Sequence, residues 1–279
     1  MMRKGIGIYV AVFGLAFLSP ALVAAEEGEK AKPWERFSLN VGGFVAAMSS
    51  DVRIGSQTLG TGIDVNVEDA LGLSSSVFVF RADASYRFTS NLRHRLDLNF
   101  YDLRRGSTKT LQSDIQIKDQ TYPVGTTVDS LFDLKIIRGA YSYSLFQDDR
   151  FDLGLSIGAY VMPIKFEISS STSGKASQEA ITAPLPVLGV RFDYAITPKF
   201  FIKQSLDFFY IQYENFQGSL YDAKIGIEYN IWKYVGVGVA YDYFHVQVKA
   251  EGQNYPGVDM TGKIQLTYGG LLLYGKFFF

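Results

Sequence analysis

The C-terminal segment of this 279-residue chain, residues 267–279, has an alternating pattern that few folds accommodate. One set of alternate positions is apolar and uncharged: Leu271, Leu273, Gly275, Phe277 and Phe279. The positions between them include Lys276. Because successive side chains of a strand point to opposite faces, one face is apolar and the other carries a charge. A strand that closes a membrane barrel can end on three phenylalanines, since its outer face meets lipid and its ends meet headgroups. The segment therefore predicts such a strand, with the buried last strand of a soluble all-β protein as the alternative.

This ending resembles the C-terminal signature of bacterial outer-membrane β-barrels, in which apolar residues alternate and the last residue is Phe. In that family the assembly machinery reads the signature. The resemblance implies that the barrel-assembly machinery is a partner and that the assembly signal consists of Leu271, Leu273, Phe277 and Phe279.

The first 25 residues have the layout of a secretory signal peptide. Arg3 and Lys4 precede an apolar run over residues 5–18, and Val23 and Ala25 occupy the small-residue positions of a cleavage site. The run is too short for a comfortable membrane-spanning helix. We therefore predict export, with a signal peptide over residues 1–25, a short periplasmic leader over 26–35 and an outer-membrane barrel over 36–279.

Composition excludes several classes of function. There are no cysteines and only two histidines, so disulfides and thiolate metal sites are impossible, and we expect neither a metal nor a cofactor. Loss of Arg3 and Lys4 takes Lys+Arg from 27 to 25 against 28 acids, which moves the net charge from −1 to −3. This balance is not basic enough for a nucleic-acid partner.

Strand-like alternation continues along the chain. Over residues 77–88, for example, Phe78 and Phe80 fall on one face, and Arg81 and Asp83 fall on the other. We predict an all-β fold, a transmembrane antiparallel up-and-down barrel of about 10 strands, with 8 or 12 as alternatives. Short and longer connections alternate along the chain. The short ones are at residues 89–92, 146–150, 197–199 and 231–234, and the longer ones are at 49–76, 106–127, 169–178 and 251–259. Only the connection at 215–218 breaks this alternation, because it is short. Short periplasmic turns and longer external loops are typical of such barrels.

One strand changes its pattern. Phe132, Leu134 and Ile136 form its first apolar set, but the apolar set beyond them includes Tyr141 and Tyr143. An extra residue would shift the alternation, so we predict a β-bulge at Ile136–Ile137.

The charged positions of the strands are predicted to face the lumen. They are Arg81, Asp83, Arg87, Arg95, Asp97, Asp133, Lys135, Arg138, Arg191, Asp193, Lys203, Asp207, Asp222, Lys224, Glu228, Asp242 and Lys276. Nine bases against eight acids are close to neutral. Isolated buried charges are very costly, so we expect a largely self-paired interior with at most a thin water path; a selective conduit is the alternative.

The sequence is similar in type to small outer-membrane barrels of the OmpA/OmpW kind. Members of that group serve as narrow pores, uptake routes for small apolar molecules, adhesins or envelope stabilisers. The resemblance implies a structural or interaction protein of the envelope or a narrow pore, with an uptake channel for small apolar or ionic solutes as the alternative. Outer-membrane lipid and lipopolysaccharide are the expected surroundings, and a monomer is favoured.

Enzymatic activity is not expected. The omptin proteases have ten strands, with paired acids and a His–Asp couple at the outer rim. Here His245 lies near an outer rim after Asp242, but no matching acidic pair can be placed, and no serine can be placed beside it for lipase-like chemistry.

The long connections at residues 49–76 and 106–127 are predicted to form an ordered extracellular collar. Residues 63–67 and 115–117 are strand-like within them. A cluster of oxygen ligands, Asp64, Asn66, Glu68 and Asp69, does not complete a calcium-binding EF-hand loop, so it is interpreted as a solvated acidic loop or one bound by divalent-bridged lipopolysaccharide.

Overall fold

A computed structural model describes residues 34–54, 65–117, 120–170, 174–213, 216–250 and 262–279. The predicted signal peptide and most of the predicted leader lie outside these described residues. No helix within them is long and apolar enough to cross a membrane.

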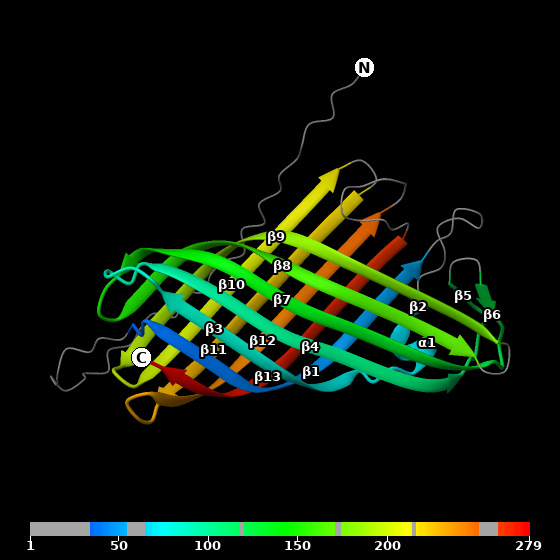
Figure 1. Cartoon of the computed structure of the whole chain (residues 1–279), viewed down its shortest axis with the longest axis horizontal. Coiled ribbons are helices and arrows are strands. Elements are labelled where there is room, and N and C mark those ends of the chain that lie inside the picture. The colour runs from blue at the N-terminus through cyan, green and yellow to red at the C-terminus, as the bar shows by residue number, and fades with distance from the viewer. Residues whose placement is uncertain (1–33, 55–64, 118–119, 171–173, 214–215, 251–261) are drawn as a thin grey trace, which may run out of the picture.

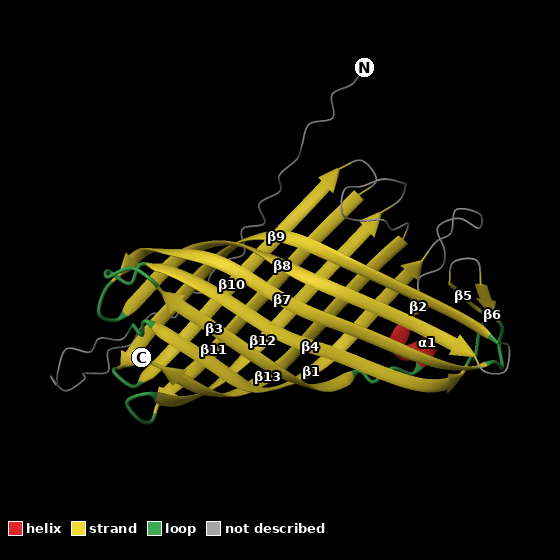
Figure 2. Ribbon diagram, in the orientation of Figure 1, coloured by secondary structure: helices red, strands yellow, loops and turns green. Residues whose placement is uncertain are grey.

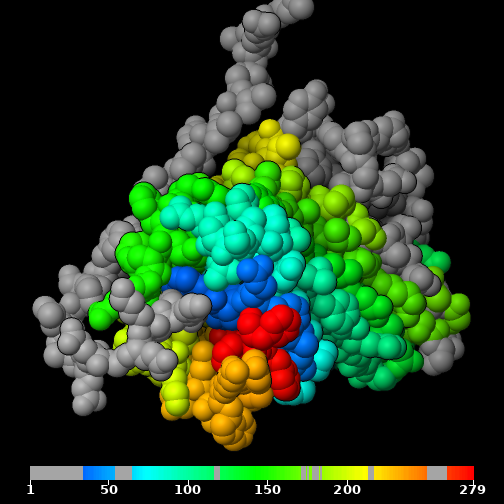
Figure 3. Space-filling view, turned by 60° about the vertical axis from the view of Figure 1, so that its left-hand side comes forward, coloured from blue at the N-terminus to red at the C-terminus, as the bar shows by residue number. Residues whose placement is uncertain are grey.

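The chain forms a closed antiparallel barrel of ten long strands, as predicted (Figure 1). These are β1 (Phe37–Ile54), β3 (Ser76–Arg87), β4 (His94–Thr110), β7 (Thr127–Gln147), β8 (Phe151–Ser170), β9 (Lys175–Thr197), β10 (Phe200–Tyr213), β11 (Phe216–Asn230), β12 (Val235–Ala250) and β13 (Gly262–Phe278). Each pairs with the next in chain order, and β13 pairs with β1. Figure 3 shows this closure, with the red C-terminal strand beside blue β1 and orange β12.

The C-terminal residues complete the barrel wall. Phe277 lies between Leu39 and Val235 in register, and the rings of Phe37 and Phe279 stack with centroids 5.2 Å apart. The predicted assembly-signal side chains point outward, with exposed fractions of 52–66% for Leu271, Leu273, Phe277 and Phe279. The apolar row is therefore on the surface that faces lipid.

The two ends of the barrel differ. The short connections and the C-terminus lie at one end, the periplasmic end (Figure 2). The small elements lie at the other, the outer end: β2 (Val65–Asn66), α1 (Val67–Leu71), β5 (Ile115–Ile117) and β6 (Gln120–Tyr122). β2 extends the sheet beside β1, and β5 pairs with β6. Residues 63–64 of the predicted collar lie outside the described part of the chain.

Several strands are much longer than a bilayer requires. β7, β8 and β9 have 21, 20 and 23 residues, whereas a tilted strand crosses the hydrocarbon core with about 9–11 residues. Much of the polar connection expected at residues 169–178 is therefore strand, up to the pair Ser170–Lys175. About half of each of these strands stands outside the membrane.

The predicted β-bulge at Ile136–Ile137 is wrong. The β4–β7 ladder runs without interruption from His94–Tyr143 to Thr110–Thr127. The alternation is unbroken through Ile136 and Ile137, and the register shift of β7 against β8 lies further along, between Ser144 and Phe146. At the predicted position it is the polarity of the two faces that inverts along the strand. Lower down, the outward face meets lipid and is apolar; higher up it meets water, and the apolar side chains turn inward to form a core.

Candidate functional site

The barrel lumen is the candidate site, and in its membrane-spanning part it is filled with ion pairs. Of the charges assigned to it, all but two point inward. The exceptions are Asp133 and Lys135, which lie on the outer surface because the neighbouring Phe132 and Leu134 are buried. Both belong to the water-exposed part of β7, where the polarity has inverted.

Three arginines gather near the periplasmic end. Arg87 contacts Asp152 at 2.7 Å, and Arg191 lies 3.3 Å from Asp152 and 3.0 Å from Asp193. Arg95 reaches Asp193 at 3.3 Å. Asp152 was not among the predicted lumenal charges, although its place in the β8 alternation puts it inside. The carboxylates of Asp152 and Asp193 therefore each contact more than one arginine.

Glu35, from the predicted leader, completes a second group. Its carboxylate lies 2.9 Å from the amines of both Lys203 and Lys276. Those lysines also bind Glu228, at 3.1 and 2.7 Å. Next to it, Trp34 donates a 2.7 Å hydrogen bond to the carbonyl of Asp148. The end of the leader thus closes part of the periplasmic mouth, which no strand alternation could have indicated.

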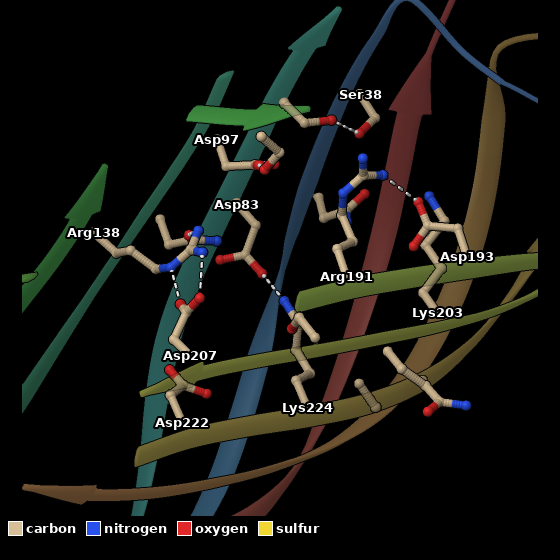
Figure 4. Close-up of a pocket in the computed structure, with 18 of the residues that line it drawn as sticks. Ser38, Asp83, Asp97, Arg138, Arg191, Asp193, Lys203, Asp207, Asp222 and Lys224 are labelled. Atoms are coloured by element: carbon tan, nitrogen blue, oxygen red, sulfur yellow. Dashed lines mark hydrogen bonds and ion pairs between the residues drawn. The ribbon is translucent and has the colours of Figure 1, made fainter. Parts of the chain in front are cut away.

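Arg81 is the centre of a third group, higher in the barrel. Its guanidinium contacts Asp83 at 3.0 Å, binds Asp242 and lies over the ring of Tyr101. Lys224 adds a contact to Asp83 at 3.2 Å (Figure 4). Arg81 is the only ion-pair partner of Asp242 within the described residues, and Asp242 is fully buried.

A fourth group shares one hydroxyl between two carboxylates. Arg138 binds Asp207, with 3.0 Å between Nη2 and Oδ1. The Tyr160 hydroxyl lies 3.0 Å from Asp207 and 2.6 Å from Asp222. Figure 4 shows Asp207 between Arg138 and Asp222. With Glu35 and Asp152 included, the lumen holds eight cations and nine acids: Arg81, Arg87, Arg95, Arg138, Arg191, Lys203, Lys224 and Lys276 against Glu35, Asp83, Asp97, Asp152, Asp193, Asp207, Asp222, Glu228 and Asp242.

Little space remains among these side chains. The cavity lined by Arg138, Arg191, Asp207 and Lys224 holds about 100 Å³. A water molecule needs a small fraction of this, so the cavity has room for a few ordered waters. The expectation of a largely self-paired interior is consistent with this geometry.

An aromatic layer lies directly above the ion pairs. It consists of Phe44, Tyr101, Tyr160, Phe244 and Tyr268, all at most 1% exposed. The rings of Phe244 and Tyr268 stack at 5.0 Å, and Phe44 meets Tyr268 edge-on at 5.3 Å. Tyr101 and Tyr268 join their hydroxyls in a hydrogen bond. The layer draws on five strands and covers the charged part of the lumen.

Above the aromatic layer the interior is an apolar core. Leu134, Met162 and Leu266 belong to it and are at most 1% exposed. Helix α1 covers one side of this core, because Val67 and Leu71 are buried in it.

An ion pair helps to fix α1 to the barrel, beside the hydrogen bonds that Ser107 and Lys109 of β4 donate to carbonyls of the helix. Glu68 binds Arg105 of β4 and accepts a 2.9 Å hydrogen bond from the Ser50 amide of β1. Asn66 caps the helix by accepting from the Asp69 amide at 2.9 Å. Glu68 and Asn66 therefore have structural partners, and Asp64 lies outside the described residues. No group of metal-ligating side chains is found among the residues that the structure describes.

His245 meets no acid among the residues that the structure describes. It points outward above the lipid-facing residues of β12, and its Nδ1 lies 2.8 Å from the Thr267 hydroxyl. Burial, together with the neighbouring Lys263, lowers its pKa. Asp242 points to the other face and binds Arg81. His94, near the periplasmic end, contacts Tyr141 at 2.7 Å. Within the described residues, neither histidine is arranged for acid–base catalysis with a carboxylate.

Comparison with known proteins supports the fold. No protein-family model matches the chain, and no curated protein matches it. The outer membrane protease OmpT from Escherichia coli has a similar structure, with a TM-score of 0.54, 10% identity and coverage of 91% of this chain and 100% of that one. Ail from Yersinia pestis, in complex with a heparin analogue, gives 0.37, 13% identity and coverage of 88% and 99%. The toluene transporter TbuX from Ralstonia pickettii gives 0.35, 9% identity and coverage of 88% and 90%. The chain has the fold of an outer-membrane β-barrel.

Proposed function

We propose that this protein is a non-conducting barrel of the bacterial outer membrane that acts as a structural or interaction protein of the envelope. Its outward apolar band and its fold support this location, and export by the predicted signal peptide would bring it there. Lipid and lipopolysaccharide would surround it, and the barrel-assembly machinery would bind the outward row ending in Phe277 and Phe279.

The observation that carries the proposal is the filled axis of the barrel. A solute would have to pass the ion pairs, the aromatic layer and the apolar core in turn. Opening a path between Arg81 and Asp242 would leave the buried carboxylate of Asp242 without an ion-pair partner among the described residues, which is strongly unfavourable. A route for ions would also need a continuous polar lining in the outer half, where Phe132, Met162 and Val246 line the interior and the charges of Arg105 and Glu68 are paired with each other.

The alternative of an uptake channel has less support. An apolar solute would fit the apolar outer half of the lumen but would then meet the charged half. An ionic solute would have to cross the apolar outer half before it reached the charged half. An enzyme has less support still, because Thr267, rather than an acid, is the partner of His245. We therefore place the interaction function on the outer collar, built from the α1 region and the β5–β6 hairpin, since loops on a rigid scaffold commonly carry recognition. Asp69 is exposed there, whereas the charge of Glu68 is neutralised by Arg105.

Planar-bilayer recording tests the proposal. Purified folded protein should give no conductance steps, or small and infrequent ones, while an open porin in the same bilayers gives large steps. Large, stable openings by this protein would contradict a filled lumen. If small steps occur, Arg191→Gln should change them, whereas Lys135→Gln on the outer surface should not.

A further inference from the structure

The lipid-facing surface contains one polar side chain in an unusual place. On β10, Lys203 and Asp207 point inward, so Gln204 shares the outward face with Ile202 and Leu206. Its register partners on the neighbouring strands are Phe192 and Ile225, which also point outward. Gln204 therefore lies on the lipid-facing wall formed by β9, β10 and β11.

The depth of Gln204 is within the hydrocarbon region. Phe200 lies two outward positions below it, near the periplasmic turn, and Tyr210 lies three outward positions above it. Aromatic residues of this kind mark the two interfaces of a barrel. Across the described strands, no other outward position between the two aromatic girdles holds an amide or a charged side chain.

An unpaired amide at this depth is costly. Its carboxamide offers two donors and one acceptor, and lipid chains offer neither. The Gln204 side chain makes no hydrogen bond within the described part of the chain, and the backbone around it is already used in the ladders to β9 and β11. Polar residues that face lipid commonly find a partner on another membrane segment.

We propose that the β9–β10–β11 wall is a homodimer interface, with Gln204 of one copy hydrogen-bonded to Gln204 of a second copy. A second copy is the fitting occupant because the amide is self-complementary. Around a two-fold axis normal to the membrane, equal depths meet, and each amide donates to the carbonyl oxygen of the other.

The surrounding surface is suited to such a contact. Leu188 and Ile225, with exposed fractions of 54% and 52%, stand on the two flanks of the wall. Ala223 lies beside Leu206 in register and leaves room for a close approach. The contact would bury apolar side chains together with the paired amides, without any charged group. The proposal departs from the sequence-based expectation of a monomer.

Sedimentation equilibrium in density-matched detergent micelles tests the proposal with the full-length mature chain. The wild type should reach a monomer–dimer equilibrium, and Gln204→Leu should raise its dissociation constant about tenfold, as the loss of two weak hydrogen bonds in an apolar medium would. Gln204→Asn should fall between them. Heat-modifiable gel migration of each variant reports whether the barrel is folded.

Crosslinking in membranes provides a test that keeps Gln204 in place. The chain has no cysteine, so Leu206→Cys introduces a single thiol beside the amide, and Ala84→Cys introduces one on β3, across the barrel. A short bismaleimide should join two Leu206→Cys copies and leave Ala84→Cys copies monomeric. Two sedimentation results would overturn the proposal: a wild type that is only monomeric, or a Gln204→Leu variant that associates like the wild type. Two crosslinking results would also overturn it: equal yields from both thiols, or crosslinks only to another protein.

Discussion

The ion pair between Arg81 and Asp242 allows a direct test of whether the lumen is self-paired. Asp242 is fully buried, and Arg81 is its only ion-pair partner in the described residues. Arg81→Met would leave that carboxylate uncompensated, because Asp83 keeps Lys224 at 3.2 Å while Asp242 keeps no cation. Removing one partner of a buried pair typically lowers the free energy of unfolding by about 3–5 kcal/mol.

The reverse substitution should cost less. Asp242→Leu leaves Arg81 with Asp83 at 3.0 Å and with the ring of Tyr101 at 4.7 Å, so the loss should be about 1–3 kcal/mol. The double variant, Arg81→Met with Asp242→Leu, removes both charges and should return to within about 1 kcal/mol of the wild type. The interaction energy of the cycle should therefore be about 3 kcal/mol or more.

Urea unfolding in lipid vesicles, followed by the fluorescence of Trp34 and Trp232, measures these free energies. Lys135→Met is the matched control, because Lys135 is exposed on the outer surface and its loss should change the free energy by less than about 0.5 kcal/mol. A double variant whose loss equals the sum of the two single losses would refute the reasoning. So would a Lys135→Met variant as damaged as Arg81→Met.

Two further outcomes are expected. Deletion of residues 277–279 should leave the chain unfolded in the periplasm, without heat-modifiable migration, because Phe277 pairs with both Leu39 and Val235 at the closure of the barrel; normal insertion of the truncated chain would contradict this. Burial and Lys263 lower the pKa of His245, so its imidazole should titrate in NMR spectra with a midpoint below the value of about 6.5 for a free histidine. A midpoint above that value would show that an acid lies beside it after all.

The sequence predicts the barrel because alternation, turn lengths and the C-terminal aromatic row depend on local pattern alone. The same pattern predicts correctly that Arg81 points inward and that Phe78 points outward. It fails at Phe132, since an apolar face indicates either lipid outside or a core inside, and period alone does not distinguish them. The height of a residue relative to the membrane decides between the two, and height depends on the whole strand. Glu35 is missed for another reason: it precedes the first strand, and its lysine partners come from β10 and β13.

The membrane also determines where the barrel wall must be closed by hydrogen bonds. The β9–β10 ladder ends at Leu188–Phe208, and the β3–β4 ladder ends at Arg81–Tyr101. One step further along β4, Asp102 is the first charged outward residue of that strand.

The paired wall thus ends near the height at which the outward face becomes polar, because lipid forbids unpaired backbone groups and water does not. Above that height β4, β7, β8 and β9 remain paired as one wall, and β10 to β13 with β1 and β3 remain paired as the other. On the edge of β9, Pro184 and Pro186 lie just beyond the last β10 pair, where a missing N–H costs nothing.

On the other side α1 joins the two walls, because Glu68 binds Arg105 of β4 and the Ser50 amide of β1. Glu68→Ala removes this link, while Ser107 and Lys109 of β4 still bind carbonyls of α1, so it should loosen the outer half and leave the membrane-spanning ring intact. Amide hydrogen exchange in micelles should become faster in the outer half alone, and exchange unchanged from the wild type would contradict this role of Glu68.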